Sequence, residues 1–299
     1  MGWRILGVRG ADWISLDNGR ITLDQQGHET LRLPPEDLDA VYLNAIEGTM
    51  TGQALAALAE AGTLLLVLDR KHMPVGMLLP VSPQHRGAEA AIAQSNASPG
   101  LKNALWKRIV STKIRNQAAV LSGFAVRDSR ALEAMASRIR PGDPDGVEAR
   151  AARIYFQAQG LRREDEADAR NAYLNYGYAI LRAAVARSLA LHGLMLPLGI
   201  WHQGIMNPAN LADDMIEPWR PLVDRALILR LKDGPIDSPL SRDERESIVR
   251  LLLSPILMDG NEWQVHDAID VSAGSLRTSF VEHRSDALRL PSVPPLPIV

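Results

Sequence analysis

The chain has 299 residues, of which 46% are hydrophobic and 23% are charged, and its formal net charge is −2 at pH 7. This is an ordinary globular composition, and the absence of cysteine excludes disulfides, zinc–thiolate sites and thiol catalysis. No apolar run approaches the roughly 18 residues that span a bilayer, and the first residues lack the features of a signal peptide. We therefore expect a cytoplasmic protein that makes no membrane contact.

Residues 1–82 have the pattern of a β-rich domain. Asp17-Asn18-Gly19 supplies the positive-φ residues of a tight hairpin turn. The Ala/Leu-rich segment 51–61 predicts a single helix. Short runs of apolar and alternating residues predict the strands, at residues 3–8, 13–16, 21–23, 28–33, 40–43, 63–68 and 74–79.

The sequence changes character after residue 82, where 83–100 is expected to form a linker. Ser241 followed by Glu244 is a capping-box signature that starts one of the predicted helices. Four prolines in the last ten residues exclude a helix or a central strand there. The expected fold is α+β, with a larger all-helical domain at 101–289 and a Pro-rich tail at 290–299. Its predicted helices are 101–125, 145–159, 168–192, 208–231 and 241–253.

A local surplus of positive charge lies between residues 90 and 127, where no Asp or Glu occurs. Such a surplus can attract phosphates even when the whole chain is close to neutral. The alternative is a solvated helix face that happens to be basic, and the pattern alone favours that alternative. The basic residues are Lys102, Lys107, Arg108, Lys113, Arg115 and Arg127.

One imidazole and three carboxylates occur within twenty residues, at His202, Asp213, Asp214 and Glu217. A helix that starts at Asn207-Pro208 places the three acids on neighbouring parts of one face. Like charges at helical spacing repel, and a divalent metal ion is the usual reason for finding them together.

Pro218 predicts a kink in that helix, because it cannot donate to the carbonyl group of Asp214. An alternative interpretation needs no metal. Asp213 and Asp214 would favour the positive end of the helix dipole, and Glu217 would pair with Arg220 or Arg225. The segment alone does not decide between the two.

Two further patterns have both a structural and a functional interpretation. Glu148 falls in the first turn of an Ala-rich helix, where a carboxylate commonly satisfies the helix dipole. Asn171 and Asn175 form an i,i+4 pair on a predicted helix, although Asn is locally unfavourable in helices. Their amides can orient a metal ligand or bind a phosphate.

In combination these segments resemble the CRISPR-associated integrase family, the catalytic subunit of spacer acquisition, and most closely its type II branch. A chain of this length without a fused domain suits subtype II-C. The residues that carry the resemblance are Gly146-Val147-Glu148-Ala149, Leu174-Asn175-Tyr176-Gly177-Tyr178-Ala179-Ile180-Leu181, Gly199-Ile200-Trp201-His202, and 210–221 from Asn210-Leu211-Ala212-Asp213-Asp214 to Glu217-Pro218-Trp219-Arg220-Pro221.

The resemblance implies a site in which Glu148, His202 and Glu217 are catalytic and bind Mg²⁺ or Mn²⁺, the ions that suit this ligand set. Asp213, Asp214, Asn171 and Asn175 would be auxiliary residues around that site. The implied reaction joins the 3′-hydroxyl of a short DNA fragment to a repeat border in a CRISPR array by transesterification, as part of antiviral defence. Candidate DNA contacts are Lys102, Lys107, Lys113, Arg115 and Arg220.

The resemblance also implies partners. These are double-stranded DNA (the incoming prespacer fragment and the CRISPR repeat), a second copy bound through the β-rich dimerisation domain, and a small second adaptation protein in a heterohexamer. The type II effector nuclease is a further possible partner. Two alternatives stay open: a metal-dependent DNase that cleaves branched DNA without integrating it, and a non-catalytic DNA-binding scaffold.

Overall fold

The computed structural model describes residues 4–8, 13–24, 30–44, 49–70, 72–78, 87–165 and 167–296. The chain divides into two compact units, Met1–Gly87 and Ala88–Val299. The first is rich in strands and the second is mostly helical, which confirms the expected α+β class. Among the described helices, none has the length and hydropathy needed to cross a membrane.

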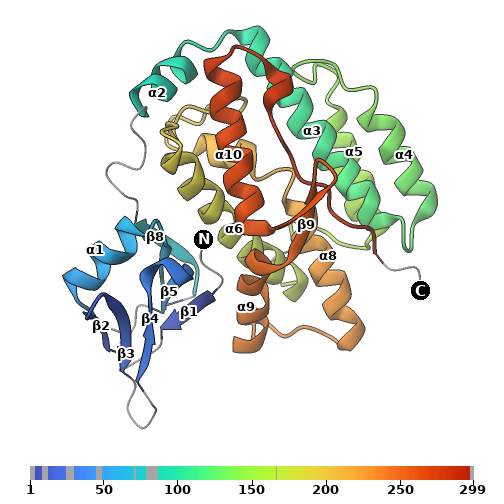
Figure 1. Cartoon of the computed structure of the whole chain (residues 1–299). Coiled ribbons are helices and arrows are strands. Elements are labelled where there is room, and N and C mark those ends of the chain that lie inside the picture. The colour runs from blue at the N-terminus through green and yellow to red at the C-terminus, as the bar shows by residue number, and fades with distance from the viewer. Residues whose placement is uncertain are drawn as a thin grey trace. The chain divides into compact units, whose positions relative to one another are not determined.

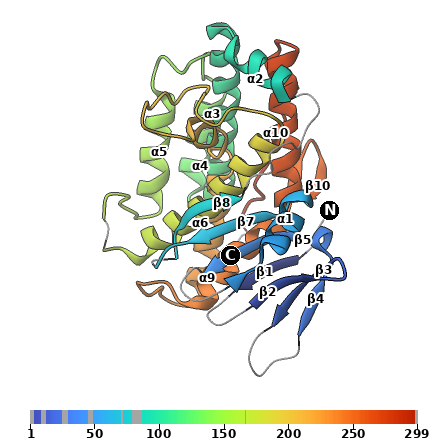
Figure 2. The same ribbon diagram turned by 90° about the vertical axis from the view of Figure 1, so that its left-hand side faces the viewer.

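The first unit contains two four-stranded sheets. The turn at Asn18 and Gly19 has the positive φ angles, 48° and 74°, that the sequence predicts for a tight hairpin. From one edge to the other, the first sheet has the strand order β1 (Arg4–Val8), β5 (Leu38–Asn44), β7 (Leu64–Leu68) and β8 (Pro74–Leu78), which can be followed in Figure 2. The other sheet has the order β4 (Leu31–Leu33), β3 (Arg20–Asp24), β2 (Trp13–Asp17) and β6 (Thr49–Met50).

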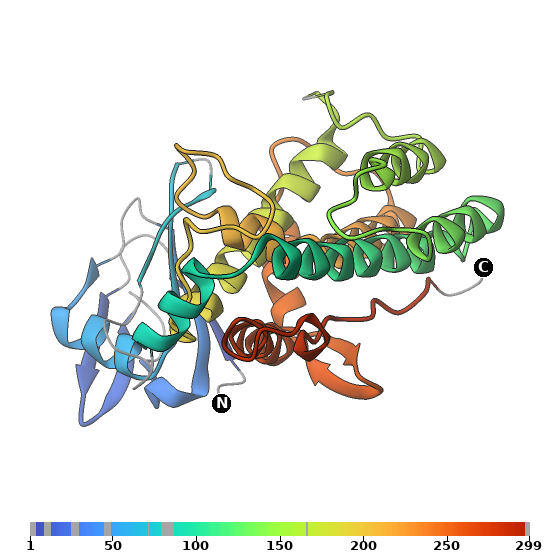
Figure 3. The same cartoon turned by 90° about the horizontal axis from the view of Figure 1, so that it is seen from above.

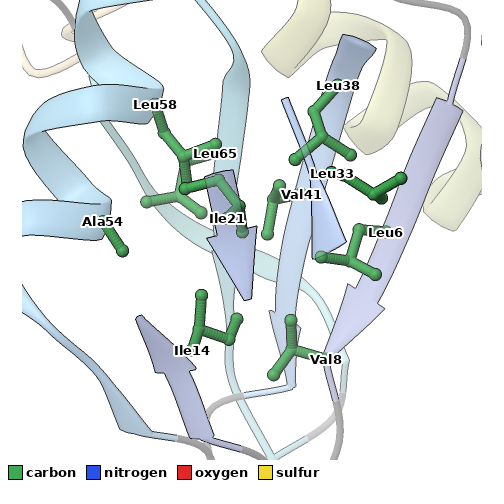
Figure 4. Close-up of a cluster of buried hydrophobic side chains, with 10 residues drawn as sticks. All are labelled: Leu6, Val8, Ile14, Ile21, Leu33, Leu38, Val41, Ala54, Leu58 and Leu65. Carbon is green, nitrogen blue, oxygen red and sulfur yellow. The ribbon is translucent and has the colours of Figure 1, made fainter. Parts of the chain in front are cut away.

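A single apolar core holds this unit together. Strands β1, β5 and β7 pair in parallel, so β7 reads as a continuous apolar run and is buried along most of its length. Helix α1 (Gly52–Glu60) adds Leu58 to the core, which also contains Leu65, Val41, Ile21 and Ile14 (Figure 4). Predicted strand residues 3, 28, 29 and 79 lie outside the described residues.

The second unit is built around helix α3 (Pro99–Leu121), which lies beside α4 and α5 in Figure 1. More than half of the residues of α3 are buried, so this helix is a central element of the unit, although Lys107 and Arg115 are exposed on it. The other elements are α2 (Gly87–Ser95), α4 (Val126–Ala136), α5 (Val147–Ala158), α6 (Ala169–Leu191), α7 (Asn210–Met215), α8 (Arg220–Arg230), α9 (Arg242–Val249), β9 (Pro255–Met258), β10 (Asn261–Gln264) and α10 (Val265–Val281).

The end of the described chain is extended and lies along α3, as Figure 3 shows. The Asn116 side chain on α3 donates to the carbonyl of Pro291 and accepts from the Val293 backbone N–H. The prolines of this segment cannot complete a backbone ladder, and a buried amide side chain satisfies part of the backbone instead.

The structure corrects four expectations. The 83–100 segment contains helix α2 and the start of α3, although a linker was expected there, and residues 83–86 lie outside the described residues. The second unit is not all helical, since β9 and β10 form an antiparallel pair. The predicted helix 208–231 is two helices, α7 and α8, separated by a turn at 216–219. Helices α4 and α10 had not been predicted.

Candidate active site

Two carboxylates from different elements meet one buried ammonium group. Glu148, in the first turn of α5, accepts a hydrogen bond from Lys113 of α3. Glu217, in the turn after α7, lies 2.5 Å from the same Lys113 Nζ. At the start of α5, Asp143 accepts from the backbone N–H groups of Val147 and Glu148. The Glu148 side chain is therefore free of a capping role and is directed at the lysine.

At this cluster the neighbouring charges affect the pKa values of Lys113 and Glu217 more strongly than burial does. Burial alone would lower the pKa of Lys113, but Glu217 and Glu148 raise it above the ordinary value. Burial alone would raise the pKa of Glu217, but the positive charges of Lys113 and Arg220 lower it. Lys113 and Glu217 are therefore held in their charged forms at neutral pH.

The turn that carries Glu217 is fixed from two sides. Asn116 of α3 donates to the carbonyl of Pro218 at 2.8 Å. Glu217 also pairs with Arg220, three residues later, at 2.8 Å, as one sequence interpretation predicted. Behind this turn α6 approaches α8 so closely that a Cβ on Gly177 would lie 2.4 Å from Val223. A glycine in the middle of α6 is thus required by packing, at some cost in helix propensity.

His202 is oriented by Asp214, whose side chain is completely buried. Asp214 accepts the Nδ1 hydrogen of His202 at 2.7 Å, and it also accepts backbone N–H groups of Ile200, Trp201 and His202. With Nδ1 used in this way, the lone pair of neutral His202 is on Nε2, which is the arrangement of a histidine ligand backed by a carboxylate. Its side chain is 45% exposed.

Close packing holds the His202 loop in place. A Cβ on Gly199 would fall 2.1 Å from the backbone oxygen of His202, so a side chain at this position cannot be accommodated. Trp201 stacks on Trp106 of α3 with ring centroids 5.3 Å apart, and the His202 ring meets Trp106 edge-on. Packing against these aromatic rings therefore fixes the position of the His202 ring.

We expect Asp214→Asn to destabilise the protein by about 2–4 kcal/mol. The side-chain NH₂ group of Asn would replace a carboxylate oxygen that accepts two N–H hydrogen bonds, and an NH₂ group cannot accept them. The hydrogen bond to Asp214, with the charge that accompanies it, raises the pKa of His202 above its ordinary 6.5. The variant should return that pKa toward the ordinary value. Thermal unfolding and an NMR titration of His202 measure the two effects.

The exposed Asp233→Asn substitution is the control, and it should change neither quantity. A raised histidine pKa stabilises the fold below pH 6.5, and this contribution is lost as the pH rises through the folded-state value. An unchanged His202 titration in Asp214→Asn would contradict the assigned role of Asp214.

The three acids of the 213–217 segment do not converge, contrary to the one-face expectation. Asp213 pairs with Arg182 of α6 at 2.5 Å and accepts from the Asn207 amide at 2.6 Å. Helix α7 starts at Asn210, later than the Asn207-Pro208 start that was expected. Because this helix is short and ends before Glu217, Asp213 and Asp214 lie on the helix and Glu217 lies in the turn after it, and each acid has its own partner.

Asn171 and Asn175 hold an arginine and have no direct contact with the carboxylates. Arg163 donates to Asn171 Oδ1 at 2.5 Å and to Asn175 Oδ1 at 2.7 Å. The Asn171 amide also donates to the carbonyls of Arg162 and Asp165, both at 2.7 Å. The pair therefore fastens the segment after α5 onto α6.

A third carboxylate, Asp224 of α8, is buried below this site. It accepts hydrogen bonds from the hydroxyl groups of Tyr155, at 2.8 Å, and Tyr178. The guanidinium of Arg220 lies over the Tyr178 ring, 4.8 Å from its centroid. Burial raises the pKa of Asp224 to about 6, against the opposing effect of the two hydroxyl groups.

This raised pKa predicts a pH-dependent stability. Between the ordinary value of 3.8 and about 6 the folded protein binds more protons at Asp224 than the unfolded chain does. Stability should fall as pH rises through that window, by roughly 3 kcal/mol in total at this group. Asp224→Asn should remove this part of the slope, which urea unfolding between pH 4.5 and 7.5 measures. Equal slopes in variant and parent would contradict it.

The carboxylate oxygens of Glu148 and Glu217 suit a divalent cation, but His202 does not lie in contact with them. Glu148 and Glu217 bring carboxylate oxygens from separate elements to one positive charge, which the ammonium of Lys113 supplies. Within the described ranges, however, no three His, Cys, Asp or Glu side chains are already grouped as a metal cluster. His202 acts on Glu217 through its charge but has no direct contact with it that would complete such a group.

The two carboxylates line a cavity of about 270 Å³, together with Gln117, Arg163 and Arg220. Of the candidate DNA contacts, Lys113 is buried and Arg220 is ion-paired, so neither is a free surface cation. Lys107 and Arg115 are exposed and Lys102 is half-buried. Their contact with DNA stays a prediction.

Sequence reasoning missed three residues of this site, Trp106, Arg163 and Asp224. Asp224 follows Glu217 by seven residues, a spacing that recurs on one helix face, and that signal was available. Arg163 had no local signal, because the residues that fix it lie on the next helix. Trp106 is one of several apolar residues of α3, and only its contact with Trp201 distinguishes it.

Sequence comparison with known proteins identifies the class of protein. A protein named CRISPR-associated endonuclease Cas1 from Neisseria meningitidis serogroup C (strain 8013) is 37% identical over 301 residues, covering 99% of this chain and 98% of the relative. Another, CRISPR-associated endonuclease Cas1 2 from Pyrobaculum aerophilum, is 32% identical over 225 residues, covering 70% and 76%. The family model for CRISPR associated protein Cas1 matches residues 8–252. The chain belongs to the Cas1 family, and the resemblance inferred from its motifs is confirmed.

Solved structures share the fold. A casposase bound to integration product superposes with a TM-score of 0.76 at 20% identity, covering 95% of this chain and 92% of the casposase. A Cas1 protein from Thermotoga maritima gives a TM-score of 0.67 at 16% identity, covering 93% and 97%. The chain also superposes on a Cas6-RT-Cas1–Cas2 complex with a TM-score of 0.73 at 21% identity, covering 96% of this chain and 36% of that one.

Proposed function

We propose that this protein is a metal-dependent DNA integrase that inserts short DNA fragments into a CRISPR array. The observation that carries the proposal is the convergence of Glu148 and Glu217 on one buried cation at the wall of a cavity. Membership of the Cas1 family supports DNA as the substrate in this proposal. The full-length similarity to the Neisseria relative supports assignment to the type II branch, subtype II-C.

Glu148, Glu217 and the Nε2 atom of His202 would hold Mg²⁺ or Mn²⁺. When bound, such an ion supplies a Lewis acid that polarises the scissile phosphate and lowers the pKa of the attacking 3′-hydroxyl. Asp214 keeps the Nε2 lone pair of neutral His202 directed outward by holding Nδ1–H. Arg220, paired with Glu217, keeps that carboxylate ionised and oriented.

The partners in this proposal are prespacer and repeat DNA, a second copy of the chain, and the small second adaptation protein in a heterohexamer. The fold shared with Cas1 in a Cas1–Cas2 complex supports the small partner. The effector nuclease of a type II system would take part in choosing fragments. No nucleotide cofactor is required, because one phosphodiester bond is exchanged for another.

The test incubates the protein and its small partner with a labelled DNA fragment, a supercoiled plasmid carrying the repeat, and Mg²⁺ or Mn²⁺. The expected result is covalent transfer of label to the plasmid at a repeat border, with none in EDTA. Cleavage without joining would replace the proposal with a DNase. Binding with neither joining nor cleavage would replace it with a scaffold.

A further inference from the structure

Tyr178 of α6 lies between a buried carboxylate and the arginine that pairs with Glu217. Its hydroxyl donates to Asp224 of α8, and the guanidinium of Arg220 lies over its ring, 4.8 Å from the centroid. Burial raises the pKa of Tyr178 well above its ordinary value, so the hydroxyl keeps its proton and is the donor in this bond. The orientation of the ring is therefore set at one end by Asp224.

Close packing of α6 against α8 brings these groups together. A Cβ on Gly177 would lie 2.4 Å from Val223, so the glycine permits this approach of the two helices. Tyr178 follows that glycine and Asp224 follows that valine, so the same approach places the hydroxyl at the carboxylate. Arg220 lies one helical turn before Asp224, and it therefore reaches the same ring from α8.

Arg220 in turn holds one oxygen of Glu217. Its Nε atom lies 2.8 Å from Oε1 of that carboxylate, whereas Oε2 lies 2.5 Å from Lys113 Nζ. The orientation of the carboxylate is therefore defined by two cations, one at each oxygen. A long arginine side chain has many rotamers, and stacking on an aromatic ring restricts them.

Asp224 also accepts from a second tyrosine, whose surroundings differ. Tyr155 of α5 donates to the other oxygen of Asp224 at 2.8 Å. Its ring meets Phe156 edge-on, with the centroids 5.2 Å apart. In the described part of the chain, the lining of the cavity of about 270 Å³ includes Tyr178 but not Tyr155. The same carboxylate thus has one hydroxyl donor at the cavity and one outside it.

We propose that Tyr178 is a positioning residue for Glu217 and that it acts through Arg220. Its hydroxyl, held by Asp224, fixes the ring on which the guanidinium rests. The guanidinium then holds Oε1 of Glu217, so that Oε2 stays directed at Lys113. Tyr178 in this way contributes to metal affinity without touching the metal. This inference rests on the proposed function, because it takes Glu217 to be a ligand of Mg²⁺ or Mn²⁺.

Tyr178→Phe and Tyr155→Phe are a matched pair of variants. Each removes one buried hydroxyl, keeps the ring and leaves one oxygen of Asp224 without its donor. The two should therefore lower the unfolding temperature by similar amounts. Only Tyr178→Phe releases the ring that supports Arg220. A loss of metal affinity confined to Tyr178→Phe thus separates positioning from a general loss of stability.

The assay is Mn²⁺ binding to the full chain without DNA, with the free ion measured by electron paramagnetic resonance. Tyr178→Phe should weaken Mn²⁺ binding roughly 3–10-fold. This is less than the roughly 10–100-fold loss typical for a direct partner of a metal ligand, because Tyr178 acts one contact further away. Tyr155→Phe should bind Mn²⁺ like the parent. Equal binding by Tyr178→Phe and the parent, or an equal loss in both variants, would overturn the proposal.

An Arg220→Gln background tests the route. If Tyr178 acts through the guanidinium, Tyr178→Phe should cause no further change in Mn²⁺ affinity once Arg220 is replaced, so the two changes are not additive. Full additivity would contradict the proposal. Strand joining by Tyr178→Phe should fall at limiting Mn²⁺ and recover at saturating Mn²⁺. A loss that saturation does not restore would contradict a role in metal affinity.

The two proposals fail separately, because Mn²⁺ binding is measured without DNA. If the parent joins no DNA but Tyr178→Phe alone weakens Mn²⁺ binding, the positioning role stands and the integrase proposal falls. If joining occurs while Tyr178→Phe binds Mn²⁺ like the parent, the positioning role falls and the integrase proposal stands.

Discussion

Glu148→Gln and Glu217→Gln should each reduce strand joining on the order of 10³-fold, because several kcal/mol of transition-state stabilisation is expected from a bound Lewis acid. Each substitution keeps the size of the side chain and removes the negative charge of a carboxylate that is proposed to bind the metal. The measurement is the rate of label transfer to the repeat plasmid under saturating Mn²⁺, together with Mn²⁺ binding followed by calorimetry.

A control variant and a DNA-binding measurement accompany this experiment. Glu133→Gln, an exposed acid of α4, should leave joining and Mn²⁺ binding unchanged. Both active-site variants should retain DNA binding in EDTA, since they remove negative charge from the path of the phosphates. Full joining activity in either one would show that its carboxylate is not a ligand.

Lys113→Met should destabilise the metal-free protein by about 3 kcal/mol, because removal of one partner leaves buried carboxylate charge without compensation. Glu217 is 7% exposed and keeps its ion pair with Arg220, whereas Glu148 is more exposed and loses the Lys113 contact. Because the pKa of Glu217 is lowered, its stabilising contribution is present above the ordinary value of 4.5 and is lost as the pH falls through the folded-state value.

The same variant should bind Mn²⁺ more tightly, since the ammonium of Lys113 occupies the position between the two carboxylates. Metal at about 100 times its Kd stabilises a protein by about 2.7 kcal/mol, which is comparable to the expected loss. Thermal unfolding in EDTA and across an Mn²⁺ titration measures both effects, and Lys107→Met is the control for loss of an exposed lysine of α3. Weaker Mn²⁺ binding in Lys113→Met would show that the lysine supports the metal and does not compete with it.

Local sequence determined the elements whose signals are short-range. The Asn18-Gly19 turn, the capping box at Ser241 and Glu244, and the long helix that begins after Asp168 are all present. Each depends on residues within one or two turns of each other. The break at 216–219 was only partly predicted, because Pro218 signals a disturbance in a helix but not its extent.

Local sequence did not predict which basic group each of the three acids pairs with. Asp213, Asp214 and Glu217 lie within five residues of each other, yet they pair with Arg182, His202 and Lys113, which come from three other segments. The i,i+4 argument assumed one continuous helix. Once the helix ends at Met215, side-chain direction is set by the turn and by packing against α3 and α6.

By itself the sequence determined the family, the α+β class and the identity of the residues that the motifs share, because these depend on residue type and order along the chain. Only the tertiary structure decided that Lys113 lies between Glu148 and Glu217, and that Asn171 and Asn175 hold Arg163. Those contacts join helices that are distant in sequence. Their geometry follows from how buried faces pack, and no local pattern records it.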